Sequence, residues 1–411
     1  MRLTMLILIV AILLSSQAIL AKDTIEWWQF WTDPAIKPTM ESMVEEFEQA
    51  NPDIDVKLTD LTWANGHEKI AIAFASGSGP DVVELGSDWI AQFAANGHLA
   101  DLSSEIAADS NDFDGWGMAT YQGAVYGQPW ILGTRVLYVN LDLAERAGHG
   151  TNYLPADWIK LLRRTRDIHL LGDDIYGWGS NTPEKHRLYK KFLPFVWSNR
   201  ADVFTSEDEG NYCVISSRHV IEAMSFYKLL HDSCGYVGSQ RNIEDAFLDG
   251  KIGYIISGDW LLKRIKLEKR DINFTTLLIP GSGTDGKVTA GKSFLGGEFL
   301  AVNSASDNPE AAKKLVDFIT QPKNQVRFCK ANHSANPSSR AAQEDEYFVS
   351  DPNLQTFIVQ LRYAVHPPVD PNWVYIEEEI EKAVEAFVFG TTSAATALYN
   401  ASVNINKIRE K

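Results

Sequence analysis

The spacing of hydrophobic positions switches regularly between two periods in the first part of the chain. Apolar residues alternate with polar ones in some segments, which is typical of strands, and recur every three or four residues in others, which is typical of helices. Prolines and the Ser76–Pro80 stretch separate the segments. The pattern predicts strands over residues 24–31, 54–58 and 81–85 and helices over residues 34–51 and 66–75. This β-α-β-α-β order predicts parallel strands joined by helical crossovers.

The same alternation returns further along the chain. It predicts extended segments within residues 126–140 and strands over 252–256, 275–279 and 297–302. Helices are predicted over residues 156–167, 217–231, 244–248, 261–267, 308–320, 372–389 and 393–408. No Gly/Ser linker separates two halves. The chain therefore reads as two α/β lobes that are connected directly by strands.

The first residues carry a different signal. Arg2 precedes an apolar run over residues 3–14, and small residues follow at Ala18 and Ala21. This layout predicts a secretory signal peptide over residues 1–21, cleaved to leave a periplasmic protein. The alternative is a membrane anchor, but the run is shorter than the ~20 residues that a spanning helix needs. No cysteine lies near the cleavage region, so no lipid-bearing N-terminal Cys is expected.

Length and charge narrow the class of protein. A chain of 411 residues predicts two or three folded units, and 45% hydrophobic residues can bury a large core. The net charge of -16 argues against a nucleic-acid partner, which would need a basic surface. Of the three cysteines, Cys213 and Cys234 are near enough in sequence to pair, leaving Cys329 as a buried thiol. The alternative is that all three are small buried residues without a disulfide.

Four segments, in order, resemble one known family. They are SGSGPDVVELGSDWIAQFAANGHLADLS (76–103), AFLDGKIGYIISGDWLLKRI (246–265), GGEFLAVNSASDNPEAAKKLVDFITQPKNQ (296–325) and the tail over residues 373–408. Together they span most of the chain after the apolar run. The chain resembles the extracellular solute-binding proteins of family 1, the group similar to maltose-binding protein.

This resemblance implies an α/β, two-lobed periplasmic-binding-protein fold of type II, the Venus-flytrap architecture. It implies a ligand cleft between the lobes and closure by hinge bending. The expected N-terminal lobe comprises residues 22–133 plus 274–311, and the C-terminal lobe 134–273 plus 312–411. The chain is expected to cross between lobes near residues 131–135, 271–275 and 308–315.

A neutral sugar needs polar partners for its hydroxyls and aromatic rings for its C–H faces, and this chain has 12 Trp. Ligands of open α/β sheets bind beyond the carboxyl ends of strands. Trp31 and Thr32 end the first predicted strand, and Glu298 begins a strand that is expected to face the cleft. By resemblance, Asp88 would bind hydroxyls beside Trp89, Trp130 and Arg135 would flank the first hinge, Trp260 would stack on a ring, and Trp373 would cap the ligand.

Each candidate has a plainer interpretation. Asp88 is also placed to cap a helix N-terminus. Trp31, Trp89 and Trp373 are also suited to packing within a lobe. Arg135 either pairs with an acid between the lobes or clamps two hydroxyls or a carboxylate of the ligand.

Other motifs in the sequence lack the structural context that their chemistry requires. Residues 286–293, GKVTAGKS, match the P-loop pattern, but a polar turn precedes them and an extended segment follows, so we expect no nucleotide site. No complete set of metal ligands is recognisable, and we expect no metal or other cofactor. Glu377, Glu378 and Glu379 are interpreted as a solvated helix face.

The sequence thus predicts the monomeric, non-enzymatic sugar-binding component of an ABC importer. It would capture a di- or oligosaccharide and deliver it to inner-membrane permease subunits. Two alternatives remain open. One is a secreted glycoside-active enzyme that uses acids such as Asp88 and Glu298. The other is a binding protein for an acidic or peptide-like ligand, in which Arg135 would dominate the cleft.

Overall fold

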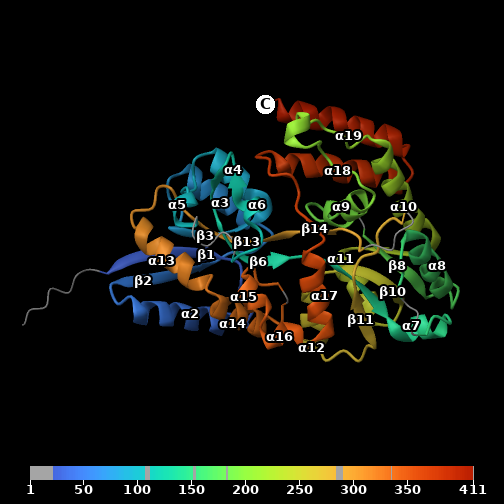
Figure 1. The fold of residues 1–411 in the computed structure, drawn as a ribbon, viewed down its shortest axis with the longest axis horizontal. Helices are drawn as coiled ribbons and strands as arrows, with labels where there is room; N and C mark the ends of the chain where they lie inside the picture. Colours follow the sequence, from blue (N-terminus) through green and yellow to red (C-terminus); the bar gives the residue numbers. More distant parts are fainter. Residues whose placement is uncertain are drawn as a thin grey trace, which may run out of the picture.

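A computed structural model describes residues 22–106, 112–150, 154–181, 184–283, 290–334 and 336–410 (Figure 1). The predicted signal peptide, residues 1–21, lies outside these ranges. Within them, every helix is too short or too polar to cross a lipid bilayer. The described chain forms two α/β lobes, each built on a five-stranded sheet.

The first sheet has the strand order β2 (Ile54–Asp60), β1 (Asp23–Gln29), β3 (Val82–Gly86), β13 (Gly296–Val302) and β6 (Gln128–Gly133). The first three strands are parallel, and β13 runs antiparallel to both of its neighbours. Side chains of a strand point alternately to its two faces, which places Ile25 and Trp27 of β1 on the same face of the sheet. These apolar side chains are buried only if helices pack against that face.

Helices cover both faces of this sheet. The core on one side includes residues of α2 (Lys37–Ala50), α13 (Pro309–Ile319) and α14 (Pro322–Asn332). The core on the other side includes residues of α3 (Gly66–Ala75), α4 (Ile90–Ala95) and α6 (Trp116–Ala119). This is the left half of Figure 1.

The second sheet has the order β11 (Phe274–Leu277), β7 (Val136–Asn140), β10 (Ile252–Ser257), β8 (Tyr176–Asn181) and β9 (Gly235–Gly238). One face packs on α8 (Trp158–His169), α9 (Tyr189–Ser198), α10 (Arg218–Cys234), α18 (Trp373–Val388) and α19 (Ala394–Arg409). The other face packs on α11 (Gln240–Leu248), α12 (Trp260–Leu267) and α17 (Pro352–Leu361). The described ranges also contain short elements: α5 (Ser103–Ile106), α7 (Leu141–Arg146), α15 (Arg340–Gln343), α16 (Glu346–Val349), β4 (Thr120–Tyr121), β5 (Ala124–Val125), β12 (Ser293–Phe294), β14 (Ala364–Val365) and the 3-10 helices η1 (Ser87–Trp89) and η2 (Glu207–Glu209).

The chain first passes from one sheet to the other after β6. Strand β6 belongs to the first sheet and β7 to the second, so the chain changes lobe at Thr134–Arg135. There the Thr134 hydroxyl donates to the carbonyl of Phe294 at 2.9 Å, and the Ser293 hydroxyl donates to the carbonyl of Arg135 at 2.7 Å. Two crossing segments are thereby tied together at the hinge.

The other two crossings differ from the prediction. Residues 274–277 pair with β7 in the second sheet, so the second crossing comes later, around β12 (Ser293–Phe294), which precedes β13. The apolar side of α13 is buried in the first core, as is Phe348 of α16 (Glu346–Val349). The third crossing therefore lies between α16 and α17. The expected lobe boundaries at 273/274 and 311/312 do not match the change of sheet, because strand pairing and burial decide lobe membership.

The three cysteines are unpaired. Cys234 and Cys329 are buried and Cys213 is half-buried. The proposed Cys213–Cys234 disulfide is not formed, and the alternative of unpaired residues describes the structure, except that Cys213 retains some exposure.

Candidate functional site

The carboxyl ends of β1, β2 and β3 meet at the edge of the first sheet that faces the second lobe. Parallel strands bring the residues that follow them together at one edge. The segments gathered there are residues 30–33, residues 61–63 and the short 3-10 helix η1 (Ser87–Trp89). Facing them across the cleft are α9 and α12 of the second lobe.

Asp88 is the polar centre of this edge. Its carboxylate accepts hydrogen bonds from the Tyr189 hydroxyl and the Lys190 ammonium, both at 2.8 Å, and both donors belong to α9 of the other lobe. Burial alone would raise the pKa of Asp88, but the charge and hydrogen bond of Lys190 outweigh it and lower the pKa. The helix-cap interpretation does not hold, because the residue preceding α4 is Trp89 and makes no side-chain cap bond.

A second polar contact joins the lobes on α12. The Lys263 ammonium lies 2.8 Å from a carboxylate oxygen of Asp33 and donates to the side-chain carbonyl of Asn332 at 2.8 Å. Asp33 follows β1, and Asn332 ends α14, so both acceptors belong to the first lobe. With the Asp88 contacts, this holds the two lobes against each other.

Trp260 is held rigidly at the start of α12. Its indole N–H donates to the Glu244 carboxylate at 2.7 Å, and that same oxygen accepts from Ser257 at 2.8 Å. The ring is half-buried, with the Arg135 guanidinium 5.4 Å and the Lys191 ammonium 5.7 Å from its centre. Gly258 is required here, because a Cβ at that position would lie 1.9 Å from the Trp260 ring.

Arg135 and Glu298 bring a guanidinium and a buried carboxyl group near the hinge. The Arg135 guanidinium lies 4.6 Å from the centre of the Phe294 ring, and burial lowers its pKa to about 10. Burial and then the charge of Asp259 raise the pKa of Glu298 to about 8, against the cations Lys190 and Arg135. The cleft thus offers hydrogen-bond donors, carboxylates and an indole face close together.

The remaining aromatic candidates pack within the lobes. Trp130 is fully buried, and its ring centre lies 5.9 Å from that of Trp27 and 4.8 Å from that of Phe328. Because the indole packs inside the first lobe, its position does not support a ligand contact. Trp31 is half-buried and packs on Phe328 at 4.8 Å.

The other candidates divide by exposure. Thr32 is exposed, while Trp89 is half-buried and lies 5.5 Å from Trp63. Trp373 is 2% exposed, and its ring centre lies 5.8 Å from that of Tyr189. Tyr189 is the residue whose hydroxyl donates to Asp88.

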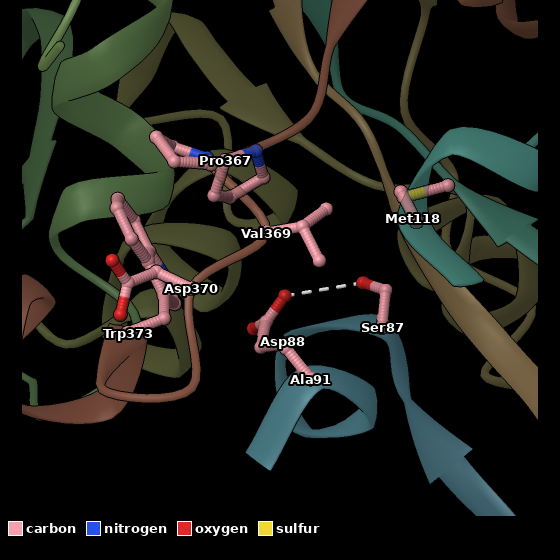
Figure 2. Close-up of a pocket in the computed structure, with 9 residues that line it drawn as sticks. Ser87, Asp88, Ala91, Met118, Pro367, Val369, Asp370 and Trp373 are labelled. Carbon is pink, nitrogen blue, oxygen red and sulfur yellow. Dashed lines mark hydrogen bonds between the residues drawn. The ribbon is translucent and has the colours of Figure 1, made fainter. Parts of the chain in front are cut away.

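Trp373 nevertheless borders a pocket beside Asp88 (Figure 2). The first lobe contributes Ser87, Asp88, Ala91 and Met118, and the second contributes Trp373 and residues 367–370. The pocket encloses about 10 Å³, which is room for about one water molecule and not for a sugar ring. A group larger than water does not fit between these residues in this arrangement of the lobes.

Glu377 corrects another expectation. It is 2% exposed rather than solvated, and it pairs with the ring of His186. Burial raises the pKa of Glu377 to about 7 despite this partner. One turn later, Glu381 accepts the backbone N–H groups of His186, Arg187 and Tyr189. These two buried acids of α18 hold the segment that presents Tyr189 and Lys190 to Asp88.

Sequence reasoning missed Tyr189, Lys190 and Lys263, together with the exposed Trp63. Helix α9 has almost no polar face and contains Pro194, so its periodicity does not indicate a helix. The polar residues at its start were the only available signal.

The P-loop match also lacks the helix that it needs. Residues 284–289 lie outside the described ranges, but Ser293 begins strand β12, and the Lys292 backbone N–H donates to Ser198 at 2.8 Å. A phosphate-binding loop requires a helix N-terminus at this point.

Comparison with known proteins decides the family. The sequence profile of the bacterial extracellular solute-binding proteins matches residues 32–326. The chain belongs to this family. A putative binding protein of Brucella abortus is 24% identical over 386 residues, which is 91% of this chain and 90% of that protein. A maltodextrin-binding protein of Bacillus subtilis is 24% identical over 385 residues, covering 91% and 88%.

Solved structures of this family share the fold. The sugar-binding protein MalE of Xanthomonas citri is 24% identical, with a TM-score of 0.82 over 94% of this chain and 97% of that one. The GacH receptor of Streptomyces glaucescens is 22% identical, with a TM-score of 0.80 over 94% and 98%. The two-lobed fold with a cleft between the lobes, expected from the sequence, is confirmed.

Proposed function

We propose that this solute-binding protein captures a neutral di- or oligosaccharide and delivers it to the permease of an ABC importer. The observation that carries the proposal is the meeting, across the cleft, of the Asp88 carboxylate with Tyr189 and Lys190. The Arg135 guanidinium, which interacts electrostatically with Asp88, lies 5.4 Å from the centre of the half-buried Trp260 ring. Carboxylates and ammonium groups suit sugar hydroxyls, and an indole face suits the C–H face of a sugar ring. The names of relatives that bind maltodextrin and galactooligosaccharide support the same class of ligand.

The proposal includes no chemical step. The Asp88 carboxylate is engaged in a contact between the lobes, and the family to which the chain belongs binds solutes. The decisive experiment is a thermal-shift screen of the purified protein against mono-, di- and oligosaccharides, followed by calorimetry and chromatography of the recovered sugar. A ligand that binds only the folded protein raises its melting temperature. Recovery of hydrolysed sugar would replace the proposal with the glycoside-active alternative.

Arg135 bears on the alternative of an acidic ligand. Arg135 is half-buried, and its guanidinium lies over the rings of Phe294 and Trp260. The carboxyl groups of Asp88 and Glu298 lie near it. The Asp88 carboxylate already has its counter-charge in Lys190, and a Glu298 carboxyl with a pKa of about 8 is largely uncharged at neutral pH, so both groups suit the hydroxyls of a neutral ligand. Including N-acetylneuraminate and a short acidic peptide in the screen tests this directly, and tight binding of either would overturn the assignment to neutral sugars.

We propose further that the protein acts as an exported monomer after cleavage near Ile19 or Lys22. The family is extracellular, and two relatives from Streptococcus pneumoniae are named as lipoproteins, so anchoring is the competing arrangement. N-terminal sequencing and mass determination of protein recovered from the exported fraction test this. A chain that begins at Met1, or one that carries a lipid, would contradict it.

A further inference from the structure

Trp63 is a large aromatic side chain at the edge of the cleft, and it takes no part in the hydrogen bonds and ion pairs described above between the lobes. It lies in the loop between β2 and α3 and is 44% exposed. One face of its indole stacks on Phe30, with ring centres 4.1 Å apart and an angle of 17° between the planes. An indole that is packed on one face and open to solvent on the other presents a flat apolar surface.

The position of the Trp63 indole is fixed by the buried Phe30 ring on which it stacks. Phe30 is 5% exposed, and its backbone N–H donates to the buried Glu84 carboxylate at 2.9 Å. Gly66 leaves the space that Phe30 occupies, since a Cβ there would lie 2.2 Å from the Phe30 Cε1 atom. Trp89 supports the indole from the side, with ring centres 5.5 Å apart. A platform held in this way loses little conformational entropy when a ring binds to it.

Trp63 also lies next to the proposed sugar site. A Cβ added to Gly86, the last residue of β3, would lie 3.7 Å from the Trp63 indole and 3.7 Å from that of Trp89. Gly86 directly precedes Ser87 and Asp88, and it pairs with Glu298 on the neighbouring strand. The exposed indole is therefore continuous with the polar groups of the cleft.

We propose that Trp63 is the stacking platform for one sugar ring at the edge of the cleft, so that the protein binds an oligosaccharide rather than a single sugar. This inference rests on the proposed function. A ring on Trp63 places its apolar C–H face on the indole and its hydroxyls toward Asp88 and Glu298, while a neighbouring ring of the same ligand lies deeper, toward Trp260. Burial of apolar surface then adds to affinity only for ligands long enough to reach Trp63.

The test measures how the binding affinity changes with the number of rings in the sugar. Glucose, maltose, maltotriose and maltotetraose, and galactose with its β-1,4-linked di- and trisaccharides, are titrated calorimetrically into the wild type and the Trp63→Ala variant. We expect the variant to bind the oligosaccharides roughly tenfold to a hundredfold more weakly, with a much smaller change for any monosaccharide. Trp63→Phe, which keeps a flat ring, should retain part of the affinity. Tyr399→Ala, which removes a 64% exposed aromatic ring from α19, is the matched control and should bind like the wild type.

The outcomes separate the two proposals. If no sugar of the panel binds the wild type, the proposed function falls, and this inference falls with it. If oligosaccharides bind and Trp63→Ala leaves their affinity unchanged, or weakens monosaccharides equally, the platform at the cleft edge is refuted while the proposed function stands.

A second measurement covers the case in which Trp63→Ala folds poorly. Wild-type protein labelled with 5-fluorotryptophan gives a resonance for Trp63, assigned by its loss in Trp63→Phe. That resonance should shift when the oligosaccharide binds, and an unmoved resonance at saturation would overturn the inference.

Discussion

The contact between Lys190 and Asp88 should hold the lobes together when no ligand is bound. Replacing Lys190 with Met keeps the length of the side chain and removes its charge. Asp88 would keep the Tyr189 hydroxyl at 2.8 Å and the Ser87 hydroxyl at 3.1 Å but would lose its counter-charge. We therefore expect Lys190→Met to shift the ligand-free protein toward an open arrangement.

The size of this shift follows from the geometry. The ion pair spans 2.8 Å, and its side chains are 21% and 13% exposed, so water screens it less than a surface pair. A hydrogen bond to a charged group contributes about 1.5–3 kcal/mol. Loss of that contribution changes the ratio of closed to open protein by roughly 10- to 150-fold, since about 1.4 kcal/mol is a factor of ten. The uncompensated Asp88 carboxylate adds to the effect, because opening returns it to water.

Small-angle X-ray scattering of the ligand-free protein measures this directly as an increase in radius of gyration. The matched control is Lys37→Met, which breaks an ion pair of the same 2.8 Å length whose side chains are 44% and 40% exposed and both belong to the first lobe. If Lys190→Met scatters like the wild type and like this control, the pair does not hold the lobes together and the reasoning fails.

Three further outcomes are expected. Trp260→Ala should weaken sugar binding by about 2–4 kcal/mol while the protein still folds; an unchanged calorimetric affinity beside a collapsed melting curve would make Trp260 a packing residue. Because burial and Asp259 raise the pKa of Glu298 from 4.5 to about 8, the folded protein binds more protons than the unfolded chain between these values, and this group's contribution to stability is lost as pH rises through them. Glu298→Gln should therefore reduce the fall in melting temperature between pH 5 and pH 8, and an unaltered pH profile would contradict the shifted pKa. Lys292→Ala should leave sugar affinity unchanged, and binding of ATP by the wild type that this variant loses would restore the rejected nucleotide site.

Local structure could be predicted from the sequence wherever a single element carries its own pattern. Helix α3 has the predicted bounds, Gly66–Ala75, and β10 and α13 differ from prediction by a residue or two at their ends. In these elements the period of the apolar residues reports which side faces the core, and turns or caps mark the ends. The ordered motifs likewise identified the family, which the comparison with known proteins confirmed.

Only the tertiary structure decided which segments share a lobe and which side chains meet in the cleft. Strand β11 joins the second sheet because it pairs with β7, and α13 belongs to the first lobe because its apolar side is buried there. Burial of Trp130 and the meeting of Lys190 with Asp88, 102 residues away, were likewise undetermined by sequence. Periodicity reports burial but not the partner that provides it, and a contact between lobes depends on how two separately built sheets are joined at their crossings.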